Sequence, residues 1–325
     1  MVRNMNIELY VAPLRAVVES KLQAFLEYES GGLAASMLIG TRMDSDQSLY
    51  AHAKVIGIFD IFSVSGMHVS NLWSITSSLS AFVLKGKRMV TIVSLTILIL
   101  YMLFVGFQLP IIRAVVMRVV SVLVAQTTGR FLSPALVLLV LCVCYYCTDK
   151  SVFTKISFQF SYLVTFLLVA FGSSSLMQNR HLRIERLRVN SLVQDVQQFA
   201  LQSWRTSLLA QAGAIPLSLF HFGYWTPLGI LISPLFGILA NLVYSGTLLF
   251  VILEFIPFFS VVSTYFGVHL YSLISVFEYL VSFFAQFDSL FISIKPTVLQ
   301  AGIAGFLVLM FYLSLKKENR VFSVL

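Results

Sequence analysis

Long apolar runs, separated by short polar or basic loops, dominate the chain from about residue 55 to residue 315. Most of them approach the roughly 20 residues that a helix needs to cross a bilayer. The runs cover residues 55–84, 89–107, 109–126, 131–148, 156–172, 204–222, 228–255, 257–288 and 298–315. The pattern predicts an all-α fold, a polytopic membrane helical bundle of about nine spans with broken or kinked helices. The run at 257–288 is long for one crossing, so we expect either two short segments or one strongly tilted helix there.

Residues 1–54 are the part of the chain without a long apolar run. An apolar stripe at helical spacing extends from Leu14 to Phe25, and Gly31-Gly32 marks the end of this helix. We expect a juxtamembrane helical hairpin here, not a separate domain. The predicted organisation is an extracytoplasmic segment at 1–54, a membrane domain at 55–315 and a cytoplasmic tail at 316–325.

Composition agrees with a membrane protein and excludes an ordinary soluble domain. Of the 325 residues, 58% are hydrophobic and 11% are charged, whereas soluble domains carry about 25% charged residues. The three cysteines lie within one apolar run, where we expect them to act as small apolar residues. The five histidines form no HxH or HExxH pattern, and no Walker-type nucleotide loop occurs. We therefore expect no metal, no cofactor and no catalytic residue in this chain.

Basic residues gather after the first, third, fifth and ninth runs. The positive-inside rule then places these ends in the cytoplasm and the N-terminus outside. The exit of the seventh run has no basic cluster, and Lys150 and Lys155 fall on the opposite side. The net charge of +8 has two interpretations, a topology signal alone or a surplus that favours a polyanion. The clustered residues are Lys85, Lys87, Arg88, Arg130, Arg180, Arg183, Arg186, Arg188, Lys316, Lys317 and Arg320.

The segment Phe59–Trp73 places acidic, hydroxyl, amide and imidazole groups inside an apolar run. Such groups are costly in hydrocarbon unless something satisfies them. Gly66 allows a break in the backbone, and Ser65 and His68 are three residues apart, which puts both on one face of a helical turn. Three interpretations stay open: a serine–histidine nucleophile, a hydrogen-bonded helix break, or a polar segment that lines a solute path.

A second polar element combines Gln108 with two arginines in the run at 109–126. Pro110 suits the first turn of a new helix. Arg113 and Arg118 are five residues apart, which separates them by about 140° around a helix. Arginine at membrane depth usually faces a partner or a water-filled cavity. An arginine here could pair with an acidic residue, or both could face an anionic solute, since the guanidinium fork suits phosphate.

Further polar residues interrupt the later runs. Gln159 lies in the run at 156–172, where alone it is a weak signal. Arg205, Gln211 and His221 follow in the run at 204–222, and Asn241 follows in the next run. The polar positions of this stretch suit either contacts between helices or the wall of a pore. Prolines in the same stretch favour discontinuous helices around a path.

Taken in order, these segments resemble the competence domain of the ComEC family, the inner-membrane channel of bacterial DNA uptake. Residues 62–69 are similar to that family's HLLAISGLHV segment, and Gly40-Thr41-Arg42 is similar to its GDR step. The element from Gly106 to Ala114 resembles the family's G…P…RA pattern. Residues 158–162 resemble FQLSF, and residues 210–241 resemble the AQ…P…HF…PL…N stretch.

The resemblance implies passage of single-stranded DNA into the cytoplasm during transformation, in the bacterial cytoplasmic (inner) membrane. Family members usually also carry an N-terminal β-domain, and many carry a C-terminal metallo-β-lactamase-like domain. Neither is recognisable here, and no HxHxDH metal motif occurs. We therefore expect any nuclease to be a separate protein. A separate DNA receptor and an ATP-driven helicase are further expected partners, with the lipid bilayer around the chain.

These inferences combine in a passive, electropositive conduit for a DNA strand. Arg113 and Arg118 would meet phosphates, and Phe107, Trp204 and Trp225 could stack with bases. The alternative is a multi-pass transporter of a small anionic or lipidic substrate, and a third possibility is an intramembrane hydrolase that uses Ser65 and His68. The predicted path residues are Ser65, Gly66, His68, Gln108, Arg113, Arg118, Gln159, Arg205, Gln211, His221 and Asn241.

Overall fold

The computed structural model describes residues 2–41, 48–62, 64–130, 132–172 and 189–287, together with 292, 293, 297, 302, 305, 306 and 309. The described residues are almost entirely helical, which confirms the predicted all-α fold. The chain divides into two compact units. Unit 1 contains Met1–Arg130 and Leu235–Asp288, and unit 2 contains Phe131–Pro234 and Ser289–Leu325.

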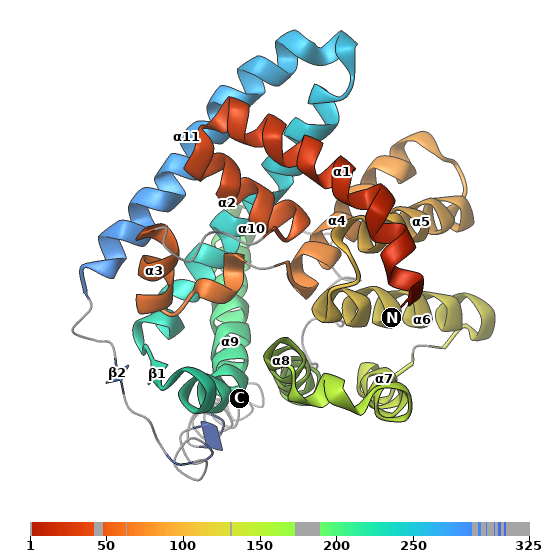
Figure 1. Cartoon of the computed structure of the whole chain (residues 1–325). Coiled ribbons are helices and arrows are strands. Elements are labelled where there is room, and N and C mark those ends of the chain that lie inside the picture. The colour runs from red at the N-terminus through yellow and green to blue at the C-terminus, as the bar shows by residue number, and fades with distance from the viewer. Residues whose placement is uncertain are drawn as a thin grey trace. The chain divides into compact units, whose positions relative to one another are not determined.

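Unit 1 consists of helices from both parts of its sequence (Figure 1). The first part forms α1 (Val2–Leu26), α2 (Tyr28–Ile39), α3 (Ser48–Val55), η1 (Phe59–Phe62), α4 (Gly66–Val83), α5 (Lys87–Val105) and α6 (Leu109–Thr128). The chain returns to unit 1 within α10 (Leu228–Glu254) and continues through η4 (Pro257–Phe259) and α11 (Ser260–Ala285). α10 therefore belongs to both units.

Unit 2 is built around the pair α8 and α9. Its elements are α7 (Pro134–Thr148), η2 (Lys150–Thr154), α8 (Ile156–Gly172), α9 (Val189–Phe222), β1 (Tyr224–Trp225) and β2 (Ile292–Ser293). β1 and β2 pair antiparallel and form the one small sheet of the described residues. Leu208 and Leu209 of α9 are buried, and Leu168 of α8 packs against them.

The apolar run predicted at 55–84 is not one helix. α3 ends at Val55, and α4 begins only at Gly66. Gly57 between them has a φ of 78°, a left-handed conformation that favours glycine. Ser65 is extended, with φ −131° and ψ 177°, and forms the N-cap of α4. The polar segment therefore contains a backbone break, which agrees with the interpretation of this segment as a hydrogen-bonded helix break.

Four segments in the described part of the chain are long and apolar enough to cross a membrane, namely α5, α6, α10 and the combined η4–α11 segment. The helices α7 and α8 are apolar but shorter. α11 is continuous over 26 residues, so the alternative of two short segments at 257–288 is wrong. Residues 298–315 lie largely outside the described residues, and the predicted nine spans are not confirmed.

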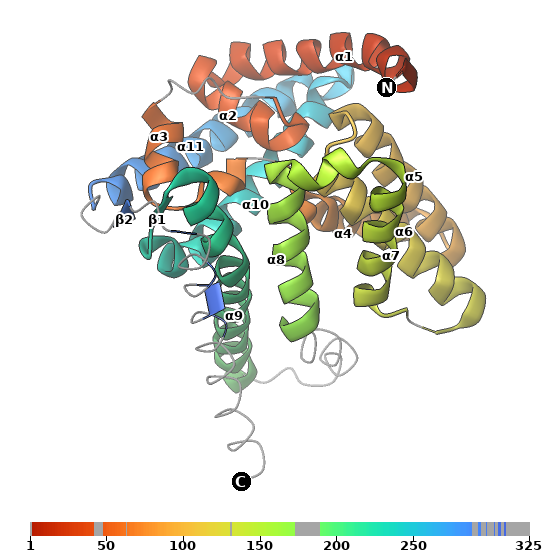
Figure 2. The same ribbon diagram turned by 60° about the horizontal axis from the view of Figure 1, so that its bottom comes forward.

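The two N-terminal helices pack closely against each other within unit 1 (Figure 2). Gly31 makes this approach possible, because a Cβ there would lie 2.5 Å from the Cα of Gln23. Leu22 and Leu26 of α1 are completely buried, as is Leu33 of α2. The predicted helical hairpin at the start of the chain therefore exists, and it packs onto other helices of unit 1.

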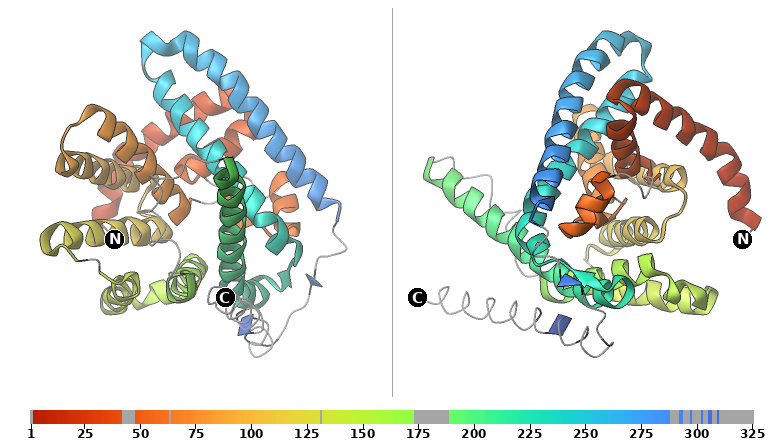
Figure 3. Two further views of the ribbon diagram at one scale, coloured as in Figure 1. Left: turned by 180° about the vertical axis from the view of Figure 1, so that it is seen from behind. Right: turned by 60° about the vertical axis from the view of Figure 1, so that its left-hand side comes forward.

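The antiparallel helices α10 and α11 contribute most of the aromatic core of unit 1 (Figure 3). Phe236 and Phe277 are fully buried, with ring centroids 5.5 Å apart in an edge-on arrangement. Phe62 of η1 contacts Phe277 from another side at 5.9 Å. Phe250 contacts Phe25 of α1 at 5.0 Å. Phe62, three residues before Ser65, is thus buried in the aromatic core of unit 1.

Candidate functional site

Ser65 and His68 form a reciprocal cap at the start of α4. The Ser65 hydroxyl oxygen accepts the Met67 N–H at 3.3 Å. In return, the Ser65 N–H donates to Nδ1 of His68 at 2.9 Å. This is a capping box in which histidine occupies the third helical position, where glutamate or glutamine is usual. Because Nδ1 accepts a hydrogen bond, the neutral ring carries its proton on Nε2.

His68 lies inside unit 1 with no exposed surface. Its ring centroid is 4.6 Å from that of Tyr244 on α10, with the ring planes tilted by 58°. Among the described residues, Nε2 of His68 has no hydrogen-bond partner. Nearby in unit 1, Tyr101 donates its hydroxyl proton to the Leu38 carbonyl oxygen at 2.8 Å. His68 and Tyr101 therefore each place a polar group in the buried part of unit 1.

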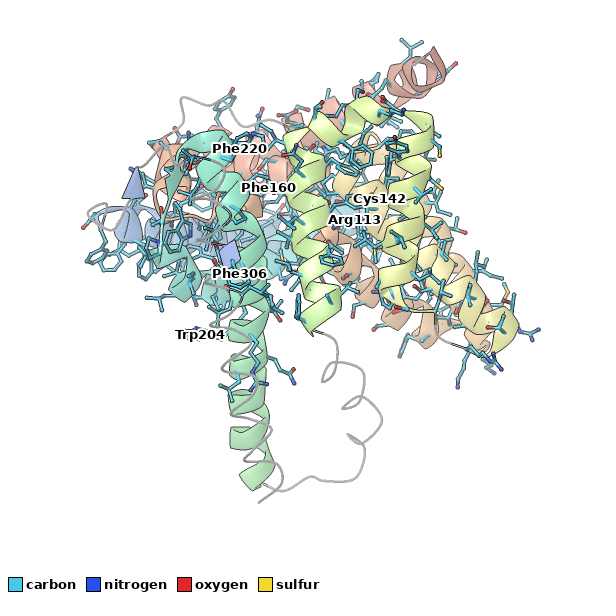
Figure 4. All side chains as sticks on the ribbon, turned by 90° about the horizontal axis from the view of Figure 1, so that it is seen from below. Arg113, Cys142, Phe160, Trp204, Phe220 and Phe306 are labelled. Atoms are coloured by element: carbon cyan, nitrogen blue, oxygen red, sulfur yellow. The ribbon has the colours of Figure 1, made fainter. Side chains whose placement is uncertain are left out.

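Arg113 lies beside the start of α4 (its position on α6 is labelled in Figure 4). It is only 7% exposed. A Cβ at Gly66 would lie 3.3 Å from a terminal guanidinium nitrogen of Arg113 and 3.6 Å from Cβ of Ala114. The N-terminus of a helix carries a partial positive charge. The guanidinium group of Arg113 thus lies beside the positive end of a helix.

The other predicted residues of the 106–118 element have contacts of their own. Gln108 is the N-cap of α6, and its side-chain amide donates to the Gly40 carbonyl oxygen at 3.4 Å. Pro110 is in the first turn of α6, as its position in the sequence predicted. Arg118 places its guanidinium carbon 5.3 Å from the centroid of the Trp73 ring on α4, a cation–π contact. The two arginines therefore both contact α4, one at its start and one two turns later.

Asn241 is one half of an amide contact between α4 and α10. The side-chain amide of Asn71 donates to Oδ1 of Asn241 at 3.3 Å and to the Ser245 hydroxyl at 2.8 Å. Sequence reasoning placed Asn241 on a path but did not identify Asn71 as its partner. The sequence does contain a signal for this contact. Each asparagine lies in an apolar helix and needs a polar partner there, so the two could have been predicted to contact each other.

In unit 2, Gln159 and His221 contact each other directly. Nε2 of His221 and Oε1 of Gln159 are 2.6 Å apart, and the amide of Gln159 donates to the Phe153 carbonyl oxygen at 2.9 Å. An amide oxygen only accepts, so the imidazole is the donor. Arg205 and Gln211 lie half-buried on α9.

The predicted path residues thus form groups within each unit. Unit 1 brings together the start of α4, Arg113, Arg118 and Trp73, and unit 2 brings together Gln159 and His221. Trp204, predicted to stack with bases, is 44% exposed and projects from α9 (Figure 4). No cluster of three or more potential metal ligands occurs within the described ranges.

The apolar spans with polar groups between them define a polytopic helical membrane protein. The sequence matches the profile of the family described as "Competence protein" over residues 37–319, and the chain belongs to this family. This membership supports a role in competence. The chain is also 24% identical over 238 residues to "ComE operon protein 3" of Bacillus subtilis (strain 168). The match covers 71% of this chain and 28% of that protein, so the chain spans less than a third of that relative. No solved structure gave a significant match.

Proposed function

We propose that the chain forms a channel in the bacterial inner membrane that passes single-stranded DNA into the cytoplasm during transformation. Membership of the competence family and the apolar spans support this proposal. The observation that carries it is the position of the Arg113 guanidinium group beside the start of α4. Each nucleotide brings one negative charge, so a strand in transit needs cationic groups that replace its counterions.

Arg113 and the start of α4 suit a phosphate group chemically. A guanidinium presents paired N–H donors that match phosphate oxygens, and helix N-termini bind anions through their free N–H groups. Arg118 lies on the same helix, with its charge over the Trp73 ring. In the proposed channel, Arg113 and Arg118 both contact phosphates of the strand.

The proposal assigns no catalytic residue to the chain. Nδ1 of His68 already accepts the Ser65 N–H, and the Ser65 hydroxyl accepts the Met67 N–H. His68 is also fully buried, whereas a hydrolytic base must reach water. We therefore assign this pair the role of a helix cap, and we propose that any nuclease, DNA receptor and ATP-driven helicase are other proteins.

Uptake of labelled DNA by cells that carry single substitutions tests the channel. Arg113→Gln removes the charge and keeps a hydrogen-bonding side chain, so we expect uptake to fall by about tenfold or more at equal protein levels in the membrane. Arg130→Gln is the matched control, because Arg130 is exposed beyond the C-terminus of α6. Arg113→Gln protein that inserts normally and supports full uptake would contradict the proposal.

The second candidate is a transporter of a small anionic or lipidic substrate. The deep burial of Arg113 favours it, because a nearly enclosed cation suits one phosphate or carboxylate group. A transporter binds a single solute saturably and has no requirement for a polymer. Inhibition of uptake by short oligonucleotides, increasing with their length, would distinguish the channel from this alternative.

A further inference from the structure

In the described part of α1, apolar residues are exposed on the outside, and charged residues contact other parts of unit 1. From Glu8 to Leu26, the most exposed residues carry no charge, and the side chains of Glu8 and Lys21 are 46% and 41% exposed. Leu9 and Tyr10 are 72% and 75% exposed, and Leu14 is 58% exposed. The exposed positions form the outer face of α1, which consists of Leu9, Tyr10, Ala12, Pro13, Leu14, Ala16, Val17, Ser20 and Ala24.

Three charged residues of α1, Glu8, Arg15 and Lys21, contact other parts of unit 1. Arg15 forms an ion pair with Glu8, and both side chains lie against the turn at Gly106, where a Cβ would meet Oε1 of Glu8 at 2.8 Å. Nζ of Lys21 is 3.0 Å from Oε1 of Glu254 at the end of α10. A helix at a water-exposed surface would turn its charges outward and its apolar stripe inward. The apolar outer face of α1 is therefore the reverse of the surface expected for a helix in contact with water.

The rotation of α1 about its own axis is fixed by packing. Val18, Leu22 and Leu26 are buried on the side opposite the outer face. Phe25 approaches Gly267 of α11 so closely that a Cβ there would lie 2.1 Å from the Phe25 ring. The outer face cannot turn inward without loss of these contacts. Its exposure is a property of the packed helix.

The outer face adjoins an apolar surface of two candidate membrane spans. Lys21, which pairs with Glu254, also lies 5.5 Å from the centroid of the Phe255 ring. Beyond Glu254, the turn between α10 and α11 exposes Phe255 at 51%, Phe258 at 88% and Val261 at 67%. Both helices at this turn are long and apolar enough to span a bilayer. Lipid that surrounds these spans would extend over the outer face of α1.

We propose that α1 lies in the plane of the membrane with its outer face in lipid, at the boundary between headgroups and acyl chains. Helices of this kind place an apolar face about 5–10 Å into the bilayer, and tyrosine is favoured at that depth. Here the polar side of the helix binds the protein itself, through the Glu8–Arg15 and Lys21–Glu254 pairs. Residues 2–36 of the two N-terminal helices precede the segment that matches the competence family, so this anchor lies beyond the family match.

Fluorescence quenching by lipid tests the anchor in the whole protein. Cys142, Cys144 and Cys147 are replaced by alanine, and a bimane label is attached at Val17→Cys or, as the matched control, at the half-buried Glu19→Cys, which lies about 160° around the helix from Val17. The proteins are reconstituted in phosphatidylcholine–phosphatidylglycerol vesicles with or without brominated phosphatidylcholine. We expect brominated lipid to reduce emission from position 17 by about twofold and to leave position 19 nearly unchanged.

Two results would overturn the anchor. If aqueous iodide quenches the label at position 17 and brominated lipid does not, the outer face is in water. If neither quencher acts and Leu14→Cys protein forms cross-links between copies, a second copy of the chain covers the face. Neither result depends on DNA uptake, so the anchor and the channel can fail separately.

Discussion

At the scale of single residues, the start of α4 shows how a histidine can serve as both cap and core. Nδ1 of His68 satisfies the Ser65 N–H, and its ring packs against Tyr244. The spacing of three between Ser65 and His68 predicted a shared helix face, and the structure adds that Ser65 is the N-cap itself. A fully buried imidazole with an acceptor role depends on staying neutral, because a protonated Nδ1 could not accept the Ser65 N–H.

Two substitutions of His68 should separate the contribution of the helix cap to stability from that of ring packing. Glutamine at the third helical position can accept the N-cap N–H, whereas leucine cannot. We therefore expect His68→Leu to lose about 1 kcal/mol more stability than His68→Gln. Thermal unfolding of the purified proteins in detergent measures the difference. Equal melting temperatures for the two variants would show that the cap contributes nothing.

At the scale of elements, glycines set how closely the helices of unit 1 approach. Gly31 and Gly32 are neighbours in α2, and the sequence predicted that both would end a helix. Instead, both lie inside α2, which continues to Ile39. Gly31 faces the backbone of α1, with only 2.5 Å between a hypothetical Cβ and the Cα of Gln23, whereas no atom lies within 4 Å at Gly32.

The same substitution at the two positions should therefore have opposite effects. Gly31→Ala forces α1 and α2 apart, which we expect to destabilise the protein by about 1–3 kcal/mol. Gly32→Ala adds helix propensity at an open position and should be neutral or stabilising by up to about 1 kcal/mol. Melting temperatures measured side by side give the comparison. A Gly31→Ala protein as stable as the Gly32→Ala protein would contradict the close contact between α1 and α2.

At the scale of the whole molecule, α1 bears on the predicted topology. Along its length it contacts both the turn at Gly106 and the end of α10 at Glu254. If α1 lies in the membrane plane, these two turns are on the same side of the membrane, and an even number of crossings separates them. The apolar runs of the sequence place five crossings between the same points, which would put them on opposite sides.

Thiol labelling of intact cells decides between the two topologies. In a cysteine-free background, Lys87→Cys and Ser260→Cys lie at the start of α5 and α11, respectively. Because α5 separates Lys87 from Gly106, an in-plane α1 predicts that a small membrane-impermeant reagent labels only one of the two positions before permeabilisation. Labelling of both or neither would support the count of nine runs and contradict an in-plane α1. Labelling of both positions in detergent is the control.

The sequence alone determined the helical class, the membrane environment and the family, because apolar runs and short ordered motifs are local properties of the chain. It also predicted the helix start at Pro110 from local chemistry, and it gave a helix break near Ser65 as one of three interpretations. Only the tertiary structure decided that Arg113 meets the start of α4, that Asn71 binds Asn241 and that His221 binds Gln159. These contacts join residues from different helices, and their partners are fixed by how the helices pack, which local periodicity does not encode.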